Sequence, residues 1–561
     1  MKRLLSVLLT IAMLLSLVTV SAMAEEKELL TIDVYDDAAN YNGIQSGWFA
    51  KLIKDKFNIE LNIIASQVVG NTIYATRSEE GNLGDILVVD KSKFPEIVEA
   101  GLARDISDKL PECKNIMVFK NQIDVYNKGL TGEEGKYYGI PTEMTDTSPT
   151  TLTDDVIYSS PMLRWDLYNQ IGAPKLENLD DLLAALVKIH EIHPVNEQND
   201  PAYPFSLWPD WDNNDNMSGP ANVVQLTTWY GQKLKGSAML MPDNTFKKLY
   251  ERDSAYYTIT KFLNKANQLG LVDPDSGTQN WDNACAKMSS GRVDVMWYSW
   301  QVGFWNSVDR LNAGTAFRFI PVGDQTYYAD ADRYFGSDRM FGIGSKVEGE
   351  KYDRIMEFLD WYASPEGVTF QHDGIEGLNY TVENGKFVPY KDNALMDNLP
   401  VPDEFGGGGF SDGNNAINQW IVSALCVNPI TGERFAQKYW QSYKDMTMTQ
   451  MKKEWAEMFG AEDDVAWMKA NGKLLASPSV DFAPAADNND IAALRADVNK
   501  CLCEYTWNLI MTCATDEEFE AMWDEMITQL DGFGYQELFD YDCALWQPEV
   551  DAKIAAAAAA E

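Results

Sequence analysis

Hydrophobic and polar residues alternate with two different periods along the first part of the chain. Residues 31–35 and 59–63 alternate with a period of two, which predicts half-buried strands. Between them, residues 47–57 place apolar side chains at spacings of three and four, which predicts an amphipathic helix. Residues 85–89 form a short apolar run, typical of a strand buried in a parallel sheet. Strands that alternate with helices in this way predict an α/β lobe.

The same alternation begins again near residue 150, which predicts a second α/β lobe. Asn178 can cap a helix over 179–189, whose apolar residues form one stripe. Further helices are predicted over 255–270, 352–362 and 516–530, and further strands over 293–297 and 317–322. From residue 416 onward the pattern predicts mostly helix, and the alanine-rich tail over 555–561 is expected to be disordered.

The first 24 residues have the pattern of an export signal. Two basic residues precede an uncharged apolar run over 4–20, and Ala22 and Ala24 stand where a signal peptidase cuts, which leaves Glu25 as the mature N-terminus. The alternative is a signal-anchor helix, but the apolar run is short for a membrane span. We therefore expect an exported protein. The first cysteine is Cys113, so no lipid anchor is expected at the cleavage site.

Length and charge narrow the possible functions. A chain of 561 residues exceeds what one hydrophobic core usually supports, so two lobes are expected. The formal net charge of −39 repels nucleic acid and anionic membrane surfaces, and no cluster of basic residues offers a local exception. The charge also favours a neutral ligand over a polyanion. Neither nucleic acid nor a membrane surface is an expected partner.

Cysteine and histidine give little support for a cofactor or a catalytic centre. The seven cysteines are odd in number and lack the spacing of zinc or redox pairs, so they are interpreted as buried thiols with room for one disulfide. Only three histidines are present, and His190 and His193 have no evident third ligand partner. A zinc site and a Ser-His-Asp triad are therefore not expected, and no cofactor is predicted.

Several segments spread along the chain together resemble one protein family. These segments are 81–86, 137–141, 163–167 with 171–174, 291–296, 364–367, 374–382 and 384–386. They are similar to segments of the extracellular solute-binding proteins of family 1, specifically the larger oligosaccharide-type members that serve bacterial ABC importers. The stretch over 374–382, which reads Gly-Ile-Glu-Gly-Leu-Asn-Tyr-Thr-Val, carries the most specific likeness.

The resemblance implies a two-lobed α/β periplasmic-binding-protein fold with a ligand cleft and hinge closure. The expected first lobe comprises 25–150 and 326–400, and the second comprises 151–325 and 401–554. The implied function is capture of a carbohydrate, most simply an oligosaccharide, for an ABC importer whose membrane permease subunits are the partners. Ligand binding that favours a closed state requires no chemical step, so no catalytic residue and no enzyme activity are expected. A monomer is expected.

A sugar presents an apolar CH face and a ring of hydroxyl groups, so its site needs flat aromatic rings beside bidentate polar groups. The chain has 17 tryptophans, several of them in polar, loop-like surroundings. Segments 210–214 and 297–301 each combine such rings with polar groups, and the second follows a predicted strand, where α/β folds place ligands. The candidate ligand-binding residues are Trp48, Asp85, Trp208, Asp210, Trp211, Asp212, Trp297, Trp300, Trp305, Arg339 and Glu376.

One segment partly follows the pattern of a calcium-binding loop. Asp210, Asp212, Asn214 and Asn216 occupy its first alternating positions. The sixth position, however, is Asp215 where glycine is needed, and the twelfth is an alanine where a bidentate glutamate is needed. These four residues are therefore weak calcium candidates, and no metal site is predicted.

Two other functions compete with solute binding. A secreted glycoside hydrolase or lyase would also be exported and rich in tryptophan and carboxylates, since two suitably spaced carboxylates suffice for hydrolysis. The pattern nevertheless lacks the eightfold repeat of a (β/α)₈ barrel. A surface adhesin would show repeats or a Ser/Thr/Pro-rich stalk, and neither is present.

Overall fold

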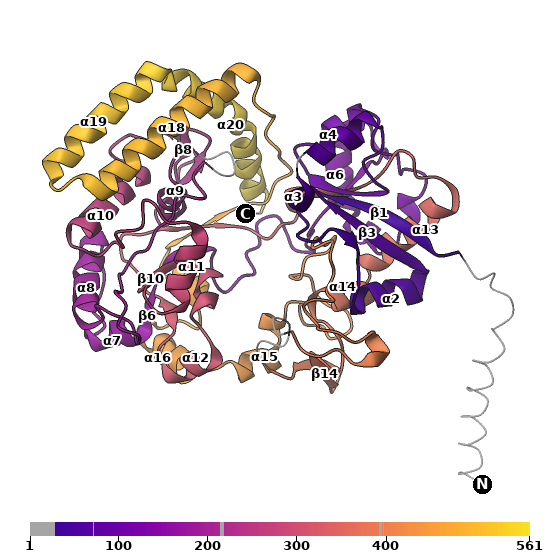
Figure 1. Ribbon diagram of the computed structural model, residues 1–561, viewed down its shortest axis with the longest axis horizontal. Helices are drawn as coiled ribbons and strands as arrows, with labels where there is room; N and C mark the ends of the chain where they lie inside the picture. The colour runs from indigo at the N-terminus through magenta and orange to yellow at the C-terminus, as the bar shows by residue number, and fades with distance from the viewer. Residues whose placement is uncertain (1–27, 71, 214–217, 392–394, 396–397, 561) are drawn as a thin grey trace, which may run out of the picture. The chain divides into compact units, whose positions relative to one another are not determined.

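The computed structural model describes residues 28–70, 72–213, 218–391, 395 and 398–560, and these divide into two compact units (Figure 1). Unit 1 is drawn from Met1–Thr142, Arg339–Thr381 and Asn393–Val422, and unit 2 from Glu143–Asp338, Val382–Asp392 and Ser423–Glu561. The boundaries differ from those expected from the sequence. Residues 326–338, expected in the first lobe, lie in unit 2, and residues 401–422, expected in the second, lie in unit 1.

Unit 1 is built on a mixed sheet of six strands in the order β2-β3-β1-β4-β13-β5. The strands are β1 (Leu30–Asp36), β2 (Gly43–Ile44), β3 (Ile59–Ala65), β4 (Ile86–Asp90), β5 (Gly139–Pro141) and β13 (Arg339–Ile343). β1 pairs in parallel with β3 and β4, and Leu30 lies opposite Ile59. β13 returns from far along the chain and pairs antiparallel with β4 and β5. The strands predicted over 31–35, 59–63 and 85–89 are confirmed.

The unit 1 helices follow the strands in the predicted alternation. They are α2 (Trp48–Phe57), α3 (Ser66–Val69), α4 (Thr72–Glu79), α5 (Phe94–Glu99), α6 (Lys120–Thr131), α13 (Gly349–Tyr362) and α14 (Pro365–His372). Two short 3-10 turns, Leu110–Glu112 and Ile116–Phe119, precede α6, and a third is Asp403–Phe405. α2 buries Phe49 and Ile53 and ends at Asn58 in the left-handed conformation, with φ of 50°. The predicted apolar stripe thus faces the core, as its period requires.

Unit 2 contains three small sheets. β6 (Ser159–Arg164) lies between β10 (Val295–Tyr298) and β11 (Phe317–Phe319) and pairs antiparallel with both. β7 (Lys233–Lys235), β8 (Ala238–Leu240) and β9 (Phe246–Lys248) form a meander, and β12 (Tyr327–Asp330) pairs in parallel with β16 (Leu474–Ser477). This last pairing is why residues 326–338 belong to unit 2. A hairpin of β14 (Tyr380–Glu383) and β15 (Lys386–Pro389) lies where the chain passes between the units.

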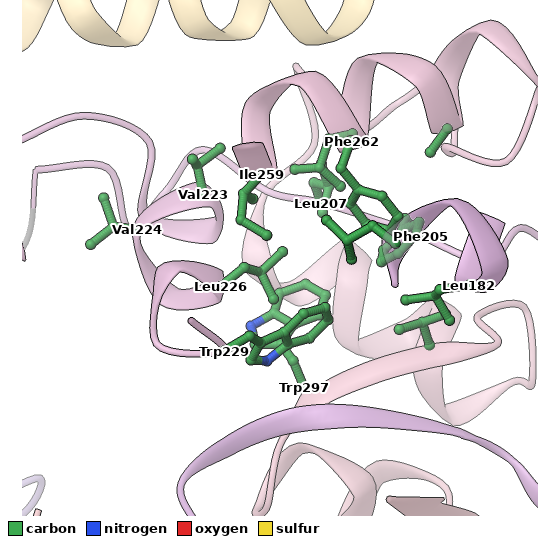
Figure 2. Packing of buried hydrophobic residues seen from close by; sticks show 14 of the residues in the cluster. Leu182, Phe205, Leu207, Val223, Val224, Leu226, Trp229, Ile259, Phe262 and Trp297 are labelled. Carbon is green, nitrogen blue, oxygen red and sulfur yellow. The ribbon is translucent and has the colours of Figure 1, made fainter. Parts of the chain in front are cut away.

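Helices supply most of the unit 2 core. They are α7 (Trp165–Gln170), α8 (Leu179–Ile192), α9 (Ala221–Thr227), α10 (Ala255–Gln268), α11 (Trp281–Ser289), α12 (Val308–Ala313), α15 (Gln441–Met446), α16 (Gln450–Phe459), α17 (Asp464–Ala470), α18 (Asn489–Thr512), α19 (Asp516–Phe533) and α20 (Tyr535–Ala560), with 3-10 turns at Gln301–Phe304 and Gln437–Tyr439. Asn178 caps α8 by accepting from the Asp181 backbone amide at 3.0 Å, as predicted. Figure 2 shows side chains of this core, where the Phe205 and Phe262 rings meet edge to face.

The C-terminal part of the chain is helical as predicted, but its alanine tail differs from the prediction. α18 and α19 lie side by side (Figure 1) and α20 continues through the alanine tail to Ala560, since alanine has the highest helix propensity of all residues. From residue 416 onward most of the chain is helical, as predicted, although residues 416–440 contain only the 3-10 turn Gln437–Tyr439 among the described elements. Asn428-Pro429 and Gly432 are turn signals that interrupt a helix in this stretch.

Two further properties bear on the predicted setting. No described helix combines the length and apolar character that crossing a membrane requires. All seven cysteines lie in the described part of the chain, and each is a free thiol.

Candidate functional site

The structure brings four of the predicted tryptophans into one aromatic cluster in unit 2. Trp208 stacks on Trp297 with ring centroids 5.3 Å apart, and Trp211 meets Trp208 edge to face at 5.3 Å. Trp300 lies 6.1 Å from Trp211. Trp281, which the sequence did not single out, joins the cluster with its ring 4.5 Å from Trp211 and 5.7 Å from Trp300. Residues far apart in sequence therefore form one continuous cluster of rings.

Burial divides this cluster into a core and an edge. Trp208 and Trp297 are 0% exposed and pack in the unit 2 core, so in this structure they offer no ring face to a ligand. Trp211 is partly buried, and Trp300 is 39% exposed. The indole N–H of Trp297 donates to Gln225 Oε1 at 3.0 Å, which fixes a polar side chain beside the buried rings. The buried tryptophans support the site, while the rings at the edge are accessible.

A cavity of about 670 Å³ begins where the aromatic cluster ends. Tyr298 stacks on Trp300 with ring centroids 5.2 Å apart and also contacts the ring of Tyr158, at 4.5 Å. Both tyrosines line the cavity, and Tyr158 is 62% exposed. Tyr158 lies just before β6 and Tyr298 ends β10, so two paired strands place both rings. This volume falls in the range of small-molecule pockets, and its wall is aromatic.

Polar groups complete the lining of the cavity. Gln225 and Thr228 come from the end of α9 and its C-cap, Tyr328 and Asp330 from β12, and Asp332 follows β12. The Tyr328 hydroxyl donates to Asp330 at 2.7 Å, and burial raises the pKa of that tyrosine. Rings beside carboxylate, amide and hydroxyl groups are the combination that binds sugars.

Three cations line the cavity, and each is paired with a carboxylate. Lys233 Nζ lies 2.8 Å from Asp330 and 4.7 Å from the centre of the Tyr328 ring. Burial is the largest single influence on the pKa of Lys233 and lowers it, but Asp330, Tyr328 and Glu549 together outweigh burial and raise that pKa, so the lysine is charged. Arg333 pairs with Glu143, and Lys438 pairs with Asp154. No cation among the described lining residues is left for a charged ligand.

Asp210 and Asp212 lie next to the aromatic cluster but are engaged within the protein. Asp210 accepts from the backbone amide of Trp281 at 2.7 Å. Asp212 accepts from the Trp507 indole at 2.8 Å and from the Ala221 amide at 3.0 Å, and burial raises its pKa to about 6. The two carboxylates thus hold α11 and the segment that enters α9.

The weak calcium candidates are only partly described. Asn214 and Asn216 lie outside the described residues, so their positions do not bear on the question. Among the described residues, no group of three or more Asp, Glu, His or Cys side chains is arranged to hold a metal ion.

Trp305 lies apart from the aromatic cluster. It is 6% exposed and is flanked by two guanidinium groups, Arg310 at 3.4 Å and Arg164 at 4.6 Å from its ring centre. Its indole N–H donates to the Thr315 carbonyl at 2.8 Å. Both the ring and its N–H are therefore used inside unit 2.

Two of the unit 1 candidates are engaged in contacts within unit 1. Trp48 is 1% exposed, and its indole N–H donates to the Phe410 carbonyl at 3.0 Å. Asp85 accepts from the Asp33 amide at 2.8 Å and pairs with Lys351.

The two other unit 1 candidates are Arg339 and Glu376. Arg339 begins β13 and pairs with Asp37. Glu376 is exposed, in the turn between α14 and β14.

Sequence reasoning missed the tyrosines that line the cavity. Tyr298 stands inside the 297–301 segment, whose tryptophans are the predicted ligand contacts. Tyr158 lies in none of the segments predicted to contact the ligand. The signal that could have found it is a large aromatic residue at the edge of a strand that pairs with the one carrying Tyr298.

Comparison with known proteins places this geometry in a family. Residues 42–369, more than half of the chain, match the family described as bacterial extracellular solute-binding protein. The lipoprotein LipO of Bacillus subtilis (strain 168) is 25% identical over 322 residues, which cover 55% of this chain and 58% of LipO. The match therefore spans less than two thirds of that relative.

Solved structures share the fold over nearly the whole chain. An HMO-binding, ABC-transporter-associated solute-binding protein from Bifidobacterium longum infantis has a TM-score of 0.59 at 15% identity and covers 94% of this chain and 100% of its own. The ABC-transporter substrate-binding protein FusA of S. pneumoniae, in complex with kestose, has a TM-score of 0.57 at 13% identity and covers 94% of this chain and 99% of its own. The fold is that of two-lobed α/β solute-binding proteins, and the chain belongs to the family of bacterial extracellular solute-binding proteins.

Proposed function

We propose that this protein binds an oligosaccharide through the cavity of unit 2 and delivers it to an ABC importer. The observation that carries the proposal is the wall of that cavity, where the Tyr158 and Tyr298 rings lie beside the amide of Gln225 and the carboxylate of Asp332. Rings can cover the CH face of a sugar while polar groups bind its hydroxyls. The neighbours with a similar fold include proteins named for HMO binding and solved with kestose, which supports the same class of ligand.

The ligand is proposed to be neutral. Each cation that lines the cavity already has a carboxylate partner, so a carboxylate or sulfate on the ligand would have to compete with that partner for the cation. The net charge of −39 adds long-range repulsion against anions. An uncharged sugar avoids both costs because its hydroxyl groups can donate to and accept from the existing pairs.

We also propose where the protein acts and with which partners. Membership of an extracellular family supports export, and membrane permease subunits of the importer are the proposed partners. We propose that the protein acts as a monomer and releases its ligand chemically unchanged. Hinge closure on the ligand stays a prediction, which a fall in the radius of gyration on adding ligand would test.

A thermal-shift screen of the mature chain against neutral and acidic oligosaccharides tests the ligand class. A ligand that binds only the folded state stabilises it by about 2.7 kcal/mol at a hundredfold excess over Kd. This stabilisation raises the melting temperature. We expect stabilisation by neutral oligosaccharides and none by uronic acid oligomers of equal length. Stabilisation by the acidic set alone, or by no sugar at all, would contradict the proposal. Shortened sugars after incubation would favour a glycoside hydrolase.

A further inference from the structure

Unit 1 has a pocket of its own, with a volume of about 320 Å³. It lies between the loop that joins β1 to α2 and the segment 411–418. Its lining is almost wholly polar and consists of Asn40, Tyr41, Gln45, Ser46, Ser411, Asp412, Asn414, Asn415, Ala416 and Asn418. None of these residues belongs to the cavity of unit 2.

Gln45 gives the clearest sign that this pocket receives a ligand. Its side chain is 5% exposed, and its Nε2 donates to the Asn414 carbonyl at 3.1 Å. Its Oε1 is buried and has no hydrogen-bond partner among the described residues. Leaving a buried acceptor unsatisfied costs on the order of 1–3 kcal/mol, so such an atom calls for a donor from outside the protein.

The two walls of the pocket are fixed against each other by close backbone contact. A Cβ atom built on Gly47 would lie 2.2 Å from Gly413 Cα, so only glycine fits there. The Phe49 amide donates to the Gly413 carbonyl at 3.1 Å. Beneath this contact, the Trp48 ring stacks on Phe410 with centroids 5.4 Å apart and planes 7° from parallel. The pocket is therefore held in shape without a ligand.

The chemistry of the lining selects a neutral ligand rich in hydroxyl groups. Four asparagines and one glutamine offer both donors and acceptors, and serine hydroxyls do the same. The one carboxylate in the lining is Asp412, which accepts from Asn398 at 2.8 Å, and none of the described lining residues is a lysine or an arginine. An anion would find no positive charge in this pocket. Tyr41 is the one aromatic ring of the lining, so hydrogen bonds rather than ring stacking would hold the ligand.

We propose that this pocket is a second binding site, which holds one sugar ring or a similar neutral polyol by its hydroxyl groups. Its volume lies at the small end of the range for ligand pockets, which fits one ring better than a chain of them. The proposal rests on the proposed carbohydrate-binding function and adds a separate site to it. A hydroxyl hydrogen of the ligand would meet Gln45 Oε1.

Hydrogen–deuterium exchange of the full mature chain tests the site, with glucose, galactose, fructose, N-acetylglucosamine and kestose as probes. We expect at least one probe to slow exchange in peptides that cover 37–47 and 407–418. The Gln45→Leu variant removes the buried acceptor and should abolish this slowing. Peptides that cover 152–159 and 328–333, from the cavity of unit 2, should respond to the oligosaccharide in both proteins.

A second variant tests the site even if Gln45→Leu does not fold correctly. Asn418 has a φ of 51°, which glycine adopts freely, so Asn418→Gly deletes a lining side chain without backbone strain. Asn244→Gly, at a φ of 65° in unit 2, is the matched control and should leave the slowing intact. We expect Asn418→Gly to reduce the slowing over 37–47 by at least about half.

The possible failures can be told apart. Slowing in the unit 2 peptides with none over 37–47 and 407–418 would overturn the second site alone. Slowing over 37–47 that survives both Gln45→Leu and Asn418→Gly would also overturn it. No slowing in either unit with any probe would count against the proposed function itself, and the second site would fall with it.

Discussion

The unit 2 cavity and the unit 1 pocket are lined by different kinds of side chain. The cavity has tyrosine rings backed by buried tryptophans and is edged by three ion pairs. The pocket has amide and hydroxyl groups, one carboxylate and one tyrosine. The cavity combines rings with polar groups, whereas the pocket offers almost only groups that form hydrogen bonds. The difference teaches that two sites proposed for one class of ligand can rest on different shares of ring stacking and hydrogen bonding.

The largest effect is expected from removing the support of the unit 1 pocket. Trp48→Ala deletes a ring that is 1% exposed, its stack on Phe410 and its hydrogen bond. Truncations of buried aromatic residues cost about 3–5 kcal/mol, so denaturant unfolding should report a loss of that order. Trp300→Ala, at 39% exposed, should cost less than about 1 kcal/mol. Equal losses for the two variants would contradict the assignment of Trp48 as a support.

A pH-dependent effect on stability, of a few kcal/mol at most, is expected from Asp36 at the end of β1 in unit 1. Burial raises the pKa of this carboxyl from 3.8 to about 7, with a further rise from Asp37, although the Ala38 amide and Arg339 act to lower it. The folded state therefore holds a proton that the unfolded state releases. The stabilisation is complete below pH 4 and is lost as the pH rises to about 7.

Melting curves between pH 4 and pH 8 check this expectation. The wild-type melting temperature should fall with rising pH by more than that of Asp36→Asn. The exposed Asp55, on α2 of the same unit, provides the control variant Asp55→Asn, which should follow the wild type. If the melting temperatures of all three proteins change with pH in parallel, Asp36 does not cause the pH dependence.

A smaller effect, on oligosaccharide affinity, is expected when a ring is removed from the aromatic wall of unit 2. Tyr158→Ala removes an exposed ring without opening the core, and oligosaccharide affinity should fall about tenfold, or about 1.4 kcal/mol. Tyr390→Ala is the matched control, because Tyr390 is 53% exposed and does not line the cavity. Calorimetric titration measures both variants. Unchanged affinity in Tyr158→Ala would shift the binding site away from this wall.

The smallest effect on oligosaccharide affinity is expected from Trp300→Ala, which tests how far the aromatic wall extends. Trp300 stacks on Tyr298 but does not itself line the cavity. Trp300→Ala should therefore weaken oligosaccharide binding only about two- to threefold, through the packing of Tyr298, which is roughly 0.5 kcal/mol. A loss larger than that of Tyr158→Ala in the same titration would show that the exposed cluster edge, rather than the cavity, contacts the sugar.

Much of the fold could be predicted from the sequence because it depends on local periodicity. The strands near residues 31–35 and 59–63 and the helix between them follow from side-chain spacing alone. The boundary of unit 1 could not be predicted in this way. It depends on Phe410, which packs on Trp48 across 362 residues of sequence, from a glycine-rich stretch with no periodic pattern.

The sequence could indicate which aromatic residues to consider, but not which of them are accessible. Trp208, Trp211, Trp297 and Trp300 do gather in one cluster, but which rings stay accessible depends on partners distant in the chain. Trp297 is covered because Trp208 stacks on it, and Tyr158 is displayed because the strand pairing of β6 with β10 sets it beside Tyr298. The unit 1 pocket gave no signal, since single asparagines in loops are common.

Calorimetric titration of the mature chain with neutral oligosaccharides of increasing length, followed by chromatography of the recovered sugar, tests the central claim most directly. The account predicts saturable binding that strengthens with length up to a limit, weakens in Tyr158→Ala, and returns the sugar intact. No binding at any length, or shortened products in the recovered sugar, would contradict it.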